Sequence, residues 1–476
     1  MVTPHIDAQL DDGLDARLLS CVVPRAAVPD LDRAATILLW AGDLKEELPV
    51  LYLRVRRAVT ELGATLVVVH PRRTGLHDVA DITISYRPGE GPDVLAALVS
   101  GPADDGPVAA AREALARGPV VAIVGRTGRA EDPRLAEAVA AFARDLPQAS
   151  LLPVTRRANV YGAFDMGLAP DLLPGRVSVD NVAGAARLED AWGPLPRDPG
   201  LGATDILEGL RSGEIEAVVL VGCDPVRDHP QPALATAALE SAGFVVAFDL
   251  FLSDSALLAD VVLPVEGFAE TEGTVTNLEG RVQKVNRIVA GPGLSRPTWS
   301  VLDDLSVRMG GELGAPSAEA IMKEIALVAP VYAGISWDLL DWGPGREGVV
   351  VPLPDVEQPL EYVPVDPGLE STSGRWALHL ARTLYDDGVL TRMSPAIGAL
   401  AAEAAAYLNP DDADALDVSR GSVLDVRAEG GSVELVVRLD PTLAAGTVYV
   451  PANLAGTAAL GASSTVDLVV RKGAGA

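Results

Sequence analysis

Two stretches of the chain, 35–70 and 215–249, share one pattern of hydrophobic and polar positions. Each begins with an unbroken apolar run, continues into a stretch whose apolar residues have helical spacing, and ends in a second apolar run. One glycine follows the first run and another precedes the second, at equal separations in the two copies: Gly42 and Gly63, and Gly222 and Gly243. This repetition predicts two copies of one β-α-β unit.

The apolar runs of both copies are short, rich in Ile, Val and Leu, and do not alternate with polar residues. Such runs are typical of parallel strands that are buried on both faces between helices. A further run at 120–125 predicts another buried strand, and 132–145 predicts the helix after it. Asp81 and Asp260 follow the second strand of each copy at nearly equal distances. We therefore predict an α/β fold with doubly wound parallel sheets in two related halves.

In the rest of the chain, the composition and the hydrophobic pattern change twice. The Pro/Gly-rich stretch 168–199 predicts an irregular connection, and 298–310 and 317–328 predict helices. The segment 343–374, rich in Pro, Gly and acidic residues, is typical of a boundary or long connection. Alternating strands around a Glu-Gly-Gly turn at 422–440 predict a small β-barrel at the C-terminal end.

A chain of 476 residues exceeds one ordinary hydrophobic core, so we expect several units. Each predicted boundary follows from the changes of pattern described above. The expected segments are a lead-in, 1–30; a first Rossmann-like half, 31–150; an irregular connection, 151–202; a second Rossmann-like half, 203–300; a helical and linker region, 301–385; and a terminal barrel, 386–476.

Charge and composition exclude several classes of function. Acidic residues outnumber basic ones 66 to 38, and the net charge of -28 repels a phosphate backbone, so we expect no nucleic-acid partner. No apolar stretch reaches the roughly 20 residues of a bilayer span. The acidic N-terminal residues do not resemble a secretory signal. The five His residues show no metal-ligand spacing, and two cysteines are too few for an iron-sulphur cluster.

Both cysteines are interpreted as unreactive. Cys21 stands in an apolar segment, RLLSCVV, which is typical of a small buried hydrophobe more than of a metal ligand. Cys223 follows Gly222 and has no nearby basic residue in the sequence that would lower the pKa of its thiol.

Ligands of doubly wound folds lie outside the carboxyl ends of the strands. This rule directs attention to Gly42 and Asp43 in the first half and to Gly222 and Asp224 in the second. Either aspartate could bind a ribose or a guanine edge, although aspartate is also common in turns for local reasons. The glycine-rich fingerprints of ordinary NAD and nucleoside-triphosphate sites are missing from both copies.

The segment 258–299 carries a resemblance to a known family. Its sequence LADVVLPVEGFAETEGTVTNLEGRVQ resembles the A-D-x-V-L-P, E-x-x-G-T and N-x-E-G-R-x-Q signature of molybdopterin oxidoreductases, which include formate dehydrogenases and dimethyl-sulfoxide reductase. Within this superfamily, 42–58 and 158–175 are similar to the G subunit of bacterial NADH-quinone oxidoreductases, known as complex I. The end of the chain, including 451–453, is similar to the molybdopterin-dinucleotide-binding barrel of the double-psi type. The resemblance covers about 30–474.

The resemblance implies a cleft between the two halves that once held a pterin dinucleotide. We expect the pterin to have been lost, no metal ligand and no catalytic residue in this chain, and iron-sulphur clusters only in an N-terminal region that the resemblance does not reach. The chain would then be a fragment, the product of a split gene or a reduced paralogue. The residues expected around the vestigial cleft are Gly42, Asp43, Gly222, Asp224, Gly273, Thr274, Asn277, Arg281 and Asn453.

The loop that bears the family signature has two interpretations. Its carboxylates could perform acid-base work if burial separated their pKa values: Glu266, Glu270, Glu272 and Glu279. We favour the alternative in which Gly273, Thr274, Asn277 and Gly280 shape a loop over the cleft and Arg281 pairs with a carboxylate.

Three functions remain open at this point. The favoured hypothesis is a scaffold on the peripheral arm of NADH:quinone oxidoreductase, bound to the flavin-bearing NADH-binding subunit and other peripheral subunits on the cytoplasmic side of the inner membrane. The second is the catalytic part of a molybdopterin-dependent oxidoreductase of the formate dehydrogenase type. The third is a pterin-binding module without redox turnover. Because function resides in sites and not in folds, the residues at the cleft must decide among them.

Overall fold

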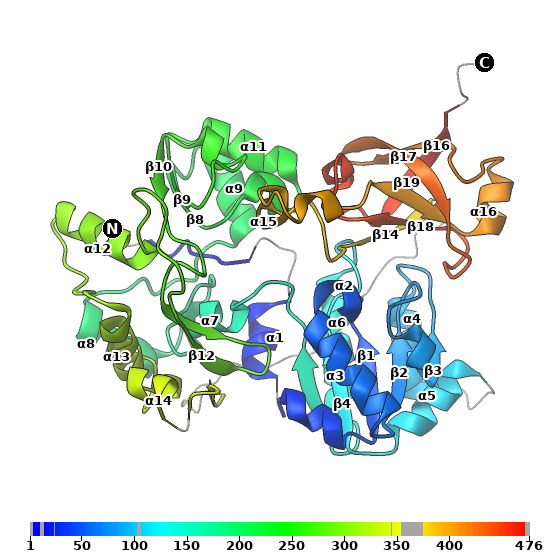
Figure 1. Ribbon diagram of the computed structural model, residues 1–476, viewed down its shortest axis with the longest axis horizontal. Helices are drawn as coiled ribbons and strands as arrows, with labels where there is room; N and C mark the ends of the chain where they lie inside the picture. Colours follow the sequence, from blue (N-terminus) through cyan, green and yellow to red (C-terminus); the bar gives the residue numbers. More distant parts are fainter. Residues whose placement is uncertain are drawn as a thin grey trace.

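The computed structural model describes residues 3–9, 14–22, 24–101, 106–343, 345–353 and 375–471. Figure 1 shows two α/β halves, a small antiparallel sheet with short helices beside it, and a barrel. The barrel lies above the first half in this view, and the second half lies beside the barrel. Among the described residues, no helix is both long enough and apolar enough to cross a bilayer.

The first half is built on a five-stranded parallel sheet in the order β3-β2-β1-β4-β5. Its strands are β1 (Thr36–Trp40), β2 (Thr65–Val69), β3 (Ile82–Ile84), β4 (Val120–Val124) and β5 (Ser150–Pro153). Its helices are α1 (Ala16–Cys21), α2 (Leu44–Glu47), α3 (Pro49–Thr60), α4 (Gly91–Ser100), α5 (Pro107–Leu115) and α6 (Pro133–Arg144). Every residue of β1 and β4 is buried, and separate apolar clusters cover the two faces. The predicted burial on both faces is confirmed here.

The second half has a three-stranded parallel sheet in the order β10-β9-β8. Its elements are α9 (Ala203–Ser212), β8 (Ala217–Val221), α10 (Pro225–Asp228), α11 (Pro232–Ser241), β9 (Phe244–Asp249) and β10 (Val261–Pro264). Helices α9 and α11 cover one face, where Leu220, Val245 and Ala247 are buried (Figure 1). The prediction of burial on both faces is wrong for this sheet, because Val219 and Val221 on the opposite face are 52% and 50% exposed.

The internal repeat extends to individual hydrogen bonds. In the first half, the amide of Leu66 donates to Oδ2 of Asp81 at 2.8 Å, and in the second half, the amide of Val245 donates to Oδ2 of Asp260 at 2.8 Å. Each aspartate lies 15 residues after its donor and directly before the next strand. The same carboxylate therefore fastens the same strand connection twice, which confirms two related halves.

The connection between the halves is more regular than predicted. It contains α7 (Val160–Asp165), β6 (Leu172–Leu173), β7 (Val177–Ser178) and α8 (Val182–Trp192). Helix α8 corrects the expectation of an irregular 168–199. Asn181 caps this helix by accepting the amide of Gly184 at 2.8 Å, and Ala185 and Leu188 bury its inner face. The flanking Pro and Gly residues obscured this short amphipathic pattern.

A small antiparallel sheet in the order β11-β12-β13 follows the second half. Its strands are β11 (Gly273–Thr276), β12 (Arg281–Val285) and β13 (Val349–Val350), and its helices are α12 (Thr298–Arg308), α13 (Ala318–Val328) and α14 (Trp337–Asp341). The two predicted helices are confirmed as α12 and α13, and Ser317 caps α13 through the amide of Ala320. Most of the predicted connection 343–374 lies outside the described residues.

The C-terminal part is a closed barrel in the order β14-β18-β15-β17-β16-β19. Its strands are β14 (Trp376–Ala381), β15 (Ala405–Leu408), β16 (Val423–Ala428), β17 (Gly431–Leu439), β18 (Thr447–Pro451) and β19 (Thr465–Val470), with the helices α15 (Val389–Arg392) and α16 (Pro410–Ala415). The predicted hairpin is confirmed as the antiparallel pair β16 and β17. Strand β14 lies before residue 386, where we expected the barrel to begin. A closed barrel leaves no free sheet edge and encloses its own apolar core.

Candidate functional site

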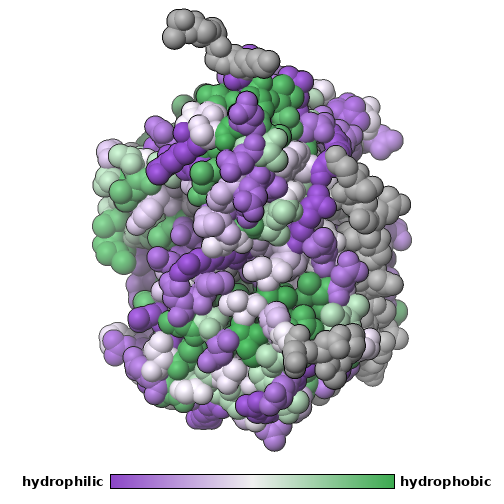
Figure 2. Space-filling view, turned by 90° about the vertical axis from the view of Figure 1, so that its right-hand side faces the viewer, coloured by the Kyte–Doolittle hydropathy of each residue, from purple (hydrophilic) through white to green (hydrophobic). Residues whose placement is uncertain are grey.

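A cavity of ≈400 Å³ lies between the carboxyl edge of the first sheet and the barrel. The loop after β4 supplies Arg126, Thr127, Gly128 and Arg129, and β14 of the barrel supplies the opposite wall through 378–380. Hydrophilic residues run across the middle of the molecule on the side that shows the barrel above the first half (Figure 2). The cavity therefore occupies the edge at which a doubly wound fold binds ligands.

Beside this cavity, aromatic rings from both parts meet. The ring of His70, directly after β2, lies 5.4 Å from the ring of His379 on β14, with the planes nearly perpendicular. The ring of His379 lies 5.5 Å from that of Tyr449, and the guanidinium of Arg72 lies 4.6 Å above Tyr449. Burial lowers the pKa of His70 to about 3 and that of His379 well below its ordinary value. Both imidazoles are therefore neutral at physiological pH.

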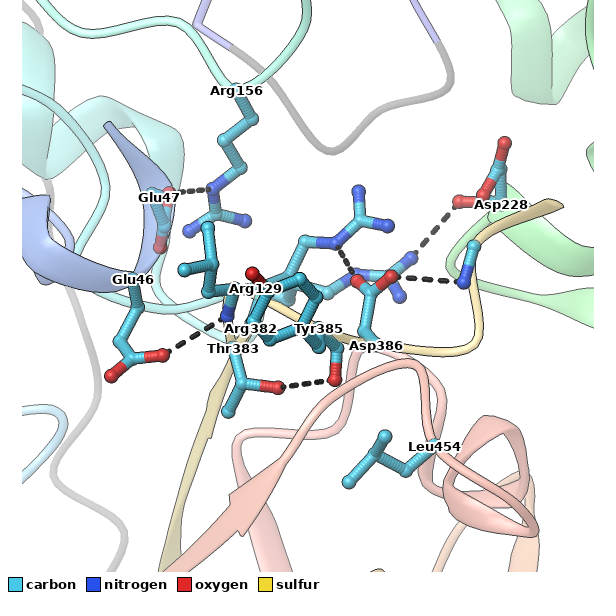
Figure 3. A network of polar contacts seen from close by, with 12 residues as sticks. Glu46, Glu47, Arg129, Arg156, Asp228, Arg382, Thr383, Tyr385, Asp386 and Leu454 are labelled. Carbon is cyan, nitrogen blue, oxygen red and sulfur yellow. Dashed lines mark hydrogen bonds and ion pairs between the residues drawn. The ribbon is translucent and has the colours of Figure 1, made fainter. Parts of the chain in front are cut away.

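Ion pairs and hydrogen bonds join three parts of the chain around this contact (Figure 3). The side chain of Arg156, after β5, pairs with Glu47 of α2, and the amide of Leu384, which follows β14, donates to Oε2 of Glu46 at 3.0 Å. The guanidinium of Arg129 donates to the carbonyl of Asp228 in the second half at 3.0 Å. The first half is thereby fastened to the barrel and to the second half.

The main chain closes the same interface. The amide of Arg129 donates to the carbonyl of Leu380 at 2.6 Å, so the loop after β4 is hydrogen-bonded to strand β14. A side chain at Gly128 would lie 3.0 Å from the carbonyl oxygen of Leu380 and 3.1 Å from Nδ1 of His379. This glycine allows the loop and the barrel to approach closely.

The two predicted aspartates, Asp43 and Asp224, accept hydrogen bonds from neighbouring loops. Oδ1 of Asp43 accepts the amides of Lys45 and Gly75, both at 3.1 Å, and Oδ1 of Asp224 accepts the amide of Ser255 at 3.1 Å and its hydroxyl at 2.6 Å. Each carboxylate thus ties the turn after the first strand to the loop after the second. Desolvation raises the pKa of both carboxyls, although Arg72 opposes this effect at Asp43. Their geometry agrees with a turn-stabilising role.

Two predicted glycines allow these turns. Gly222 has a φ of +59°, which favours glycine. A side chain at Gly42 would collide with the carboxylate of Glu47 at 2.4 Å. The position of Gly42 therefore permits the buried pair of Glu47 and Arg156 to form.

The signature loop lies against other elements. Gly273 and Thr274 are in β11; Oδ1 of Asn277 accepts the amide of Arg281 at 2.9 Å, and the Arg281 side chain lies 2.6 Å from Glu279. Oε2 of Glu279 accepts the amide of Val28 at 2.7 Å. Arg281 therefore pairs with a carboxylate, as expected in the loop-shaping interpretation. Hydrogen bonding lowers the pKa of Glu279 against the opposing effect of its desolvation.

Asn453 lies apart from the strand-end aspartates and glycines and from the signature loop. It follows β18 with a φ of +55°, and its carbonyl accepts the amide of Asp387 at 2.8 Å. Its side chain lines a small hollow of ≈10 Å³ together with Arg227 and His229 of the second half. The structure thus distributes the nine predicted residues over several sites, and none of them lines the larger cavity.

The structure describes the side chain of one of the two cysteines, Cys223. Desolvation raises the pKa of the Cys223 thiol to about 11, which keeps it protonated and unreactive. The side chain of Cys21 lies outside the described residues. Among the residues that the structure describes, no three His, Cys, Asp or Glu side chains are grouped so that they could hold a metal ion.

The wall of the cavity already pairs its own polar groups. The volume of the cavity lies within the roughly 300–1,000 Å³ that cofactor sites occupy. Nε of the buried Arg126 already donates to the carbonyl of Glu131 at 3.0 Å, and Glu131 places a carboxyl at the same wall. We therefore place no reaction step on a pterin.

Sequence reasoning missed the loop after β4. Its sequence, Arg-Thr-Gly-Arg at 126–129, follows a strand that the pattern had predicted. The same rule that selected Asp43 and Asp224 would have selected this loop, had it been applied to every strand of the sheet. His379 gave no comparable signal, because His70 and Gly128, which lie close to it, come from the first half, which is distant in the sequence.

Comparisons with known proteins agree with this architecture. Residues 120–308 match the molybdopterin oxidoreductase family, and residues 382–473 match the molybdopterin dinucleotide binding domain. Acetylene hydratase from Pelobacter acetylenicus has a similar fold, with a TM-score of 0.65 over 92% of this chain and 73% of the hydratase, at 15% sequence identity. This likeness concerns the fold alone.

Several curated relatives have different names. The alpha subunit of NADPH-Fe(3+) oxidoreductase from Geobacter sulfurreducens is 28% identical over 95% of this chain and 58% of its own length. The G subunit of NADH-quinone oxidoreductase from Streptomyces coelicolor is 31% identical over 90% of this chain and 48% of its own length. The alpha subunit of F420-dependent formate dehydrogenase 1 from Methanococcus maripaludis is 30% identical over 66% of this chain and 49% of its own length.

This chain therefore spans about half the length of the relatives that it matches. Their names agree on oxidoreductases but not on one reaction. Two family matches, a related fold and the repeated halves with a closing barrel agree with one another: residues 120–308 are similar to the molybdopterin oxidoreductase family, and residues 382–473 are similar to its dinucleotide binding domain.

Proposed function

We propose that this chain is the scaffold portion of a component of a respiratory NADH:quinone oxidoreductase, similar to the G subunit of that complex. In this role it carries no cluster and no pterin, and electron transfer from NADH to quinone belongs to the whole assembly. Its partners are the peripheral-arm subunits, in particular the flavin-bearing NADH-binding subunit. It acts at the cytoplasmic side of the inner membrane and reaches the membrane only through those partners.

One observation carries the proposal: the protein's own contacts join the first half directly to the barrel, beside the cavity. The His70 and His379 rings, the buried pair of Glu47 and Arg156, and the main-chain bond from Arg129 to Leu380 lie at this interface. In the proposed role, these contacts are sufficient to hold the two parts together. The Streptomyces coelicolor relative, matched over 90% of this chain, supports the choice of assembly.

A second function is favoured by the cavity itself. Arg126 and Arg129 border a space of ≈400 Å³ at the carboxyl edge of the first sheet, and guanidinium groups recognise phosphates and carboxylates. Relatives named as alpha subunits of F420-dependent formate dehydrogenases share 30% and 31% identity with this chain. The alternative is therefore the catalytic part of a formate dehydrogenase-type oxidoreductase.

Co-purification distinguishes the two functions. The chain would be expressed in molybdate-supplemented cells, alone and together with the flavin-bearing NADH-binding subunit of the same organism. We expect the chain alone to contain neither molybdenum, iron nor flavin, and to bind the flavin-bearing subunit. Stoichiometric molybdenum together with formate-dependent dye reduction would instead establish the alternative and contradict the scaffold.

A further inference from the structure

The open face of the second sheet is entirely apolar. The register places three rows of side chains across it: Ala217 and Phe244; Val219, Val246 and Val261; and Val221, Phe248 and Leu263. The side chains of Val219, Val221, Phe244 and Val261 are 52%, 50%, 47% and 38% exposed, whereas Phe248, near the carboxyl end of the strands, is buried. We refer to the other seven residues as the open sheet face.

This face contrasts with the rest of the molecule. Strands β1 and β4 of the first half carry the same kind of sequence and are buried at every position. In the second half, α9 and α11 cover the opposite face, and the described chain places no helix over this one. Parallel sheets occur almost only with helices on both faces. An uncovered apolar sheet in water is therefore incomplete.

From these observations we propose that the open sheet face binds an amphipathic α-helix of a partner polypeptide. A helix is the element that covers parallel strands, and its apolar side would lie along the Val219, Val246 and Val261 row. Exposed carboxylates of Glu214, Glu216 and Asp260 border the amino ends of the strands. A partner helix with basic residues on its outer side would match this rim and the net charge of -28.

The inference does not depend on the assembly proposed above, because it follows from the exposed sheet and from the acidic rim that borders it.

Peptide binding tests the proposal on the full chain. The probe is a fluorescein-labelled helical peptide of about 18 Leu and Lys residues with all Leu on one side, and its control is a scrambled peptide of equal charge. Fluorescence anisotropy should show binding of the facial peptide at least about tenfold tighter than of the scrambled one. Equal binding of the two peptides would overturn the proposal.

Two variants locate the binding. Val219→Asp should weaken binding of the facial peptide by about tenfold or more, although the added carboxylate would strengthen any purely electrostatic attraction to Lys. The control, Val50→Asp, changes a valine that is 76% exposed on α3 of the first half and should leave binding unchanged. Circular dichroism should show both variants folded, since each altered side chain is exposed. Unchanged binding by the Val219→Asp variant would contradict the assignment.

Two other occupants would also overturn the proposal. Sedimentation equilibrium that shows a dimer, converted to a monomer by Val219→Asp, would mean that a second copy covers the face. Deletion of 354–374 that strengthens peptide binding would mean that this chain covers its own sheet. A monomer with unchanged binding after the deletion supports the partner helix.

Discussion

Nε of Arg156 lies 3.2 Å from Oε2 of Glu47, and both side chains are only 6% exposed. The pair joins the loop after β5 to helix α2 (Figure 3). Desolvation raises the pKa of Glu47 even though Arg156 and Arg382 oppose it. The cost of dehydrating two charges offsets much of their attraction. The pair therefore fixes the position of the loop relative to α2 more than it adds net stability.

Breaking this pair should destabilise the protein. Arg156→Gln or Glu47→Gln leaves one buried charge without its partner and should lower the free energy of unfolding by about 3–5 kcal/mol. The double variant should lose less stability than the two single variants do together. In the double variant no buried charge remains without its partner. Urea denaturation at neutral pH measures the free energy of unfolding of the two single variants and of the double variant. Arg117→Gln, which breaks the exposed pair with Glu113, serves as control and should cost no more than about 1 kcal/mol.

A second buried ion pair lies within the connection between the halves and is hydrogen-bonded to Tyr332. Asp165 and Arg176 form a wholly buried ion pair, and the hydroxyl of Tyr332 donates to Oδ2 of Asp165 at 2.6 Å. Tyr332→Phe should therefore cost about 1.5–3 kcal/mol of stability, the range for a hydrogen bond to a charged group. Thermal unfolding checks the loss, with the exposed Tyr385→Phe as control. Equal melting temperatures for the two variants would refute the role of this bond.

Stability should fall as the pH drops below about 6.5. The folded pKa of His70 is lowered to about 3 and that of His379 is also lowered, so the unfolded chain binds protons that the folded chain excludes. Each imidazole should then cost up to about 1.4 kcal/mol per pH unit between its unfolded and folded pKa values.

Urea titrations at several pH values between about 7 and 5 measure this dependence. The variant His379→Gln should show a shallower loss, whereas His77→Gln, in a half-buried position outside the ring cluster, should follow the unsubstituted protein. Because Glu47 and Asp43 also titrate with shifted pKa values, the difference between the variant and the unsubstituted protein isolates the imidazole. Parallel curves for His379→Gln and the unsubstituted protein would contradict this role of the imidazole.

The repeated aspartates should have equal local effects. Asp81→Ala removes the acceptor of the Leu66 amide, and Asp260→Ala removes the acceptor of the Val245 amide. Each change should accelerate hydrogen exchange of its own amide and cost about 1–3 kcal/mol, with little effect on the other half. Exchange followed by mass spectrometry checks this, with the exposed Asp78→Ala as control. Acceleration spread over both halves would argue against independent copies.

The repeat and the barrel were predictable because each rests on local pattern. Unbroken apolar runs, the spacing of Gly42 to Gly63 and the alternation around Gly430 follow from the geometry of strands and turns. The openness of the second sheet was not predictable, because Val219 and Leu38 are both strongly hydrophobic, and only tertiary packing decides whether a second layer of helices is present.

The site was predictable only in part. The carboxyl edge of the first sheet borders the cavity, but Asp43 and Asp224 at the strand ends form hydrogen bonds to loop amides. The contact between His70 and His379 joins residues that are distant in sequence and belong to different units. No single-sequence pattern reports such a meeting, because it depends on how the barrel docks.

We infer above all that the architecture persists without a redox centre of its own. The most direct test is elemental analysis of the purified chain, bound to the flavin-bearing NADH-binding subunit after growth with molybdate. We expect flavin and cluster iron from the partner subunit and only background molybdenum. Molybdenum in stoichiometric amount with this chain would refute the inference.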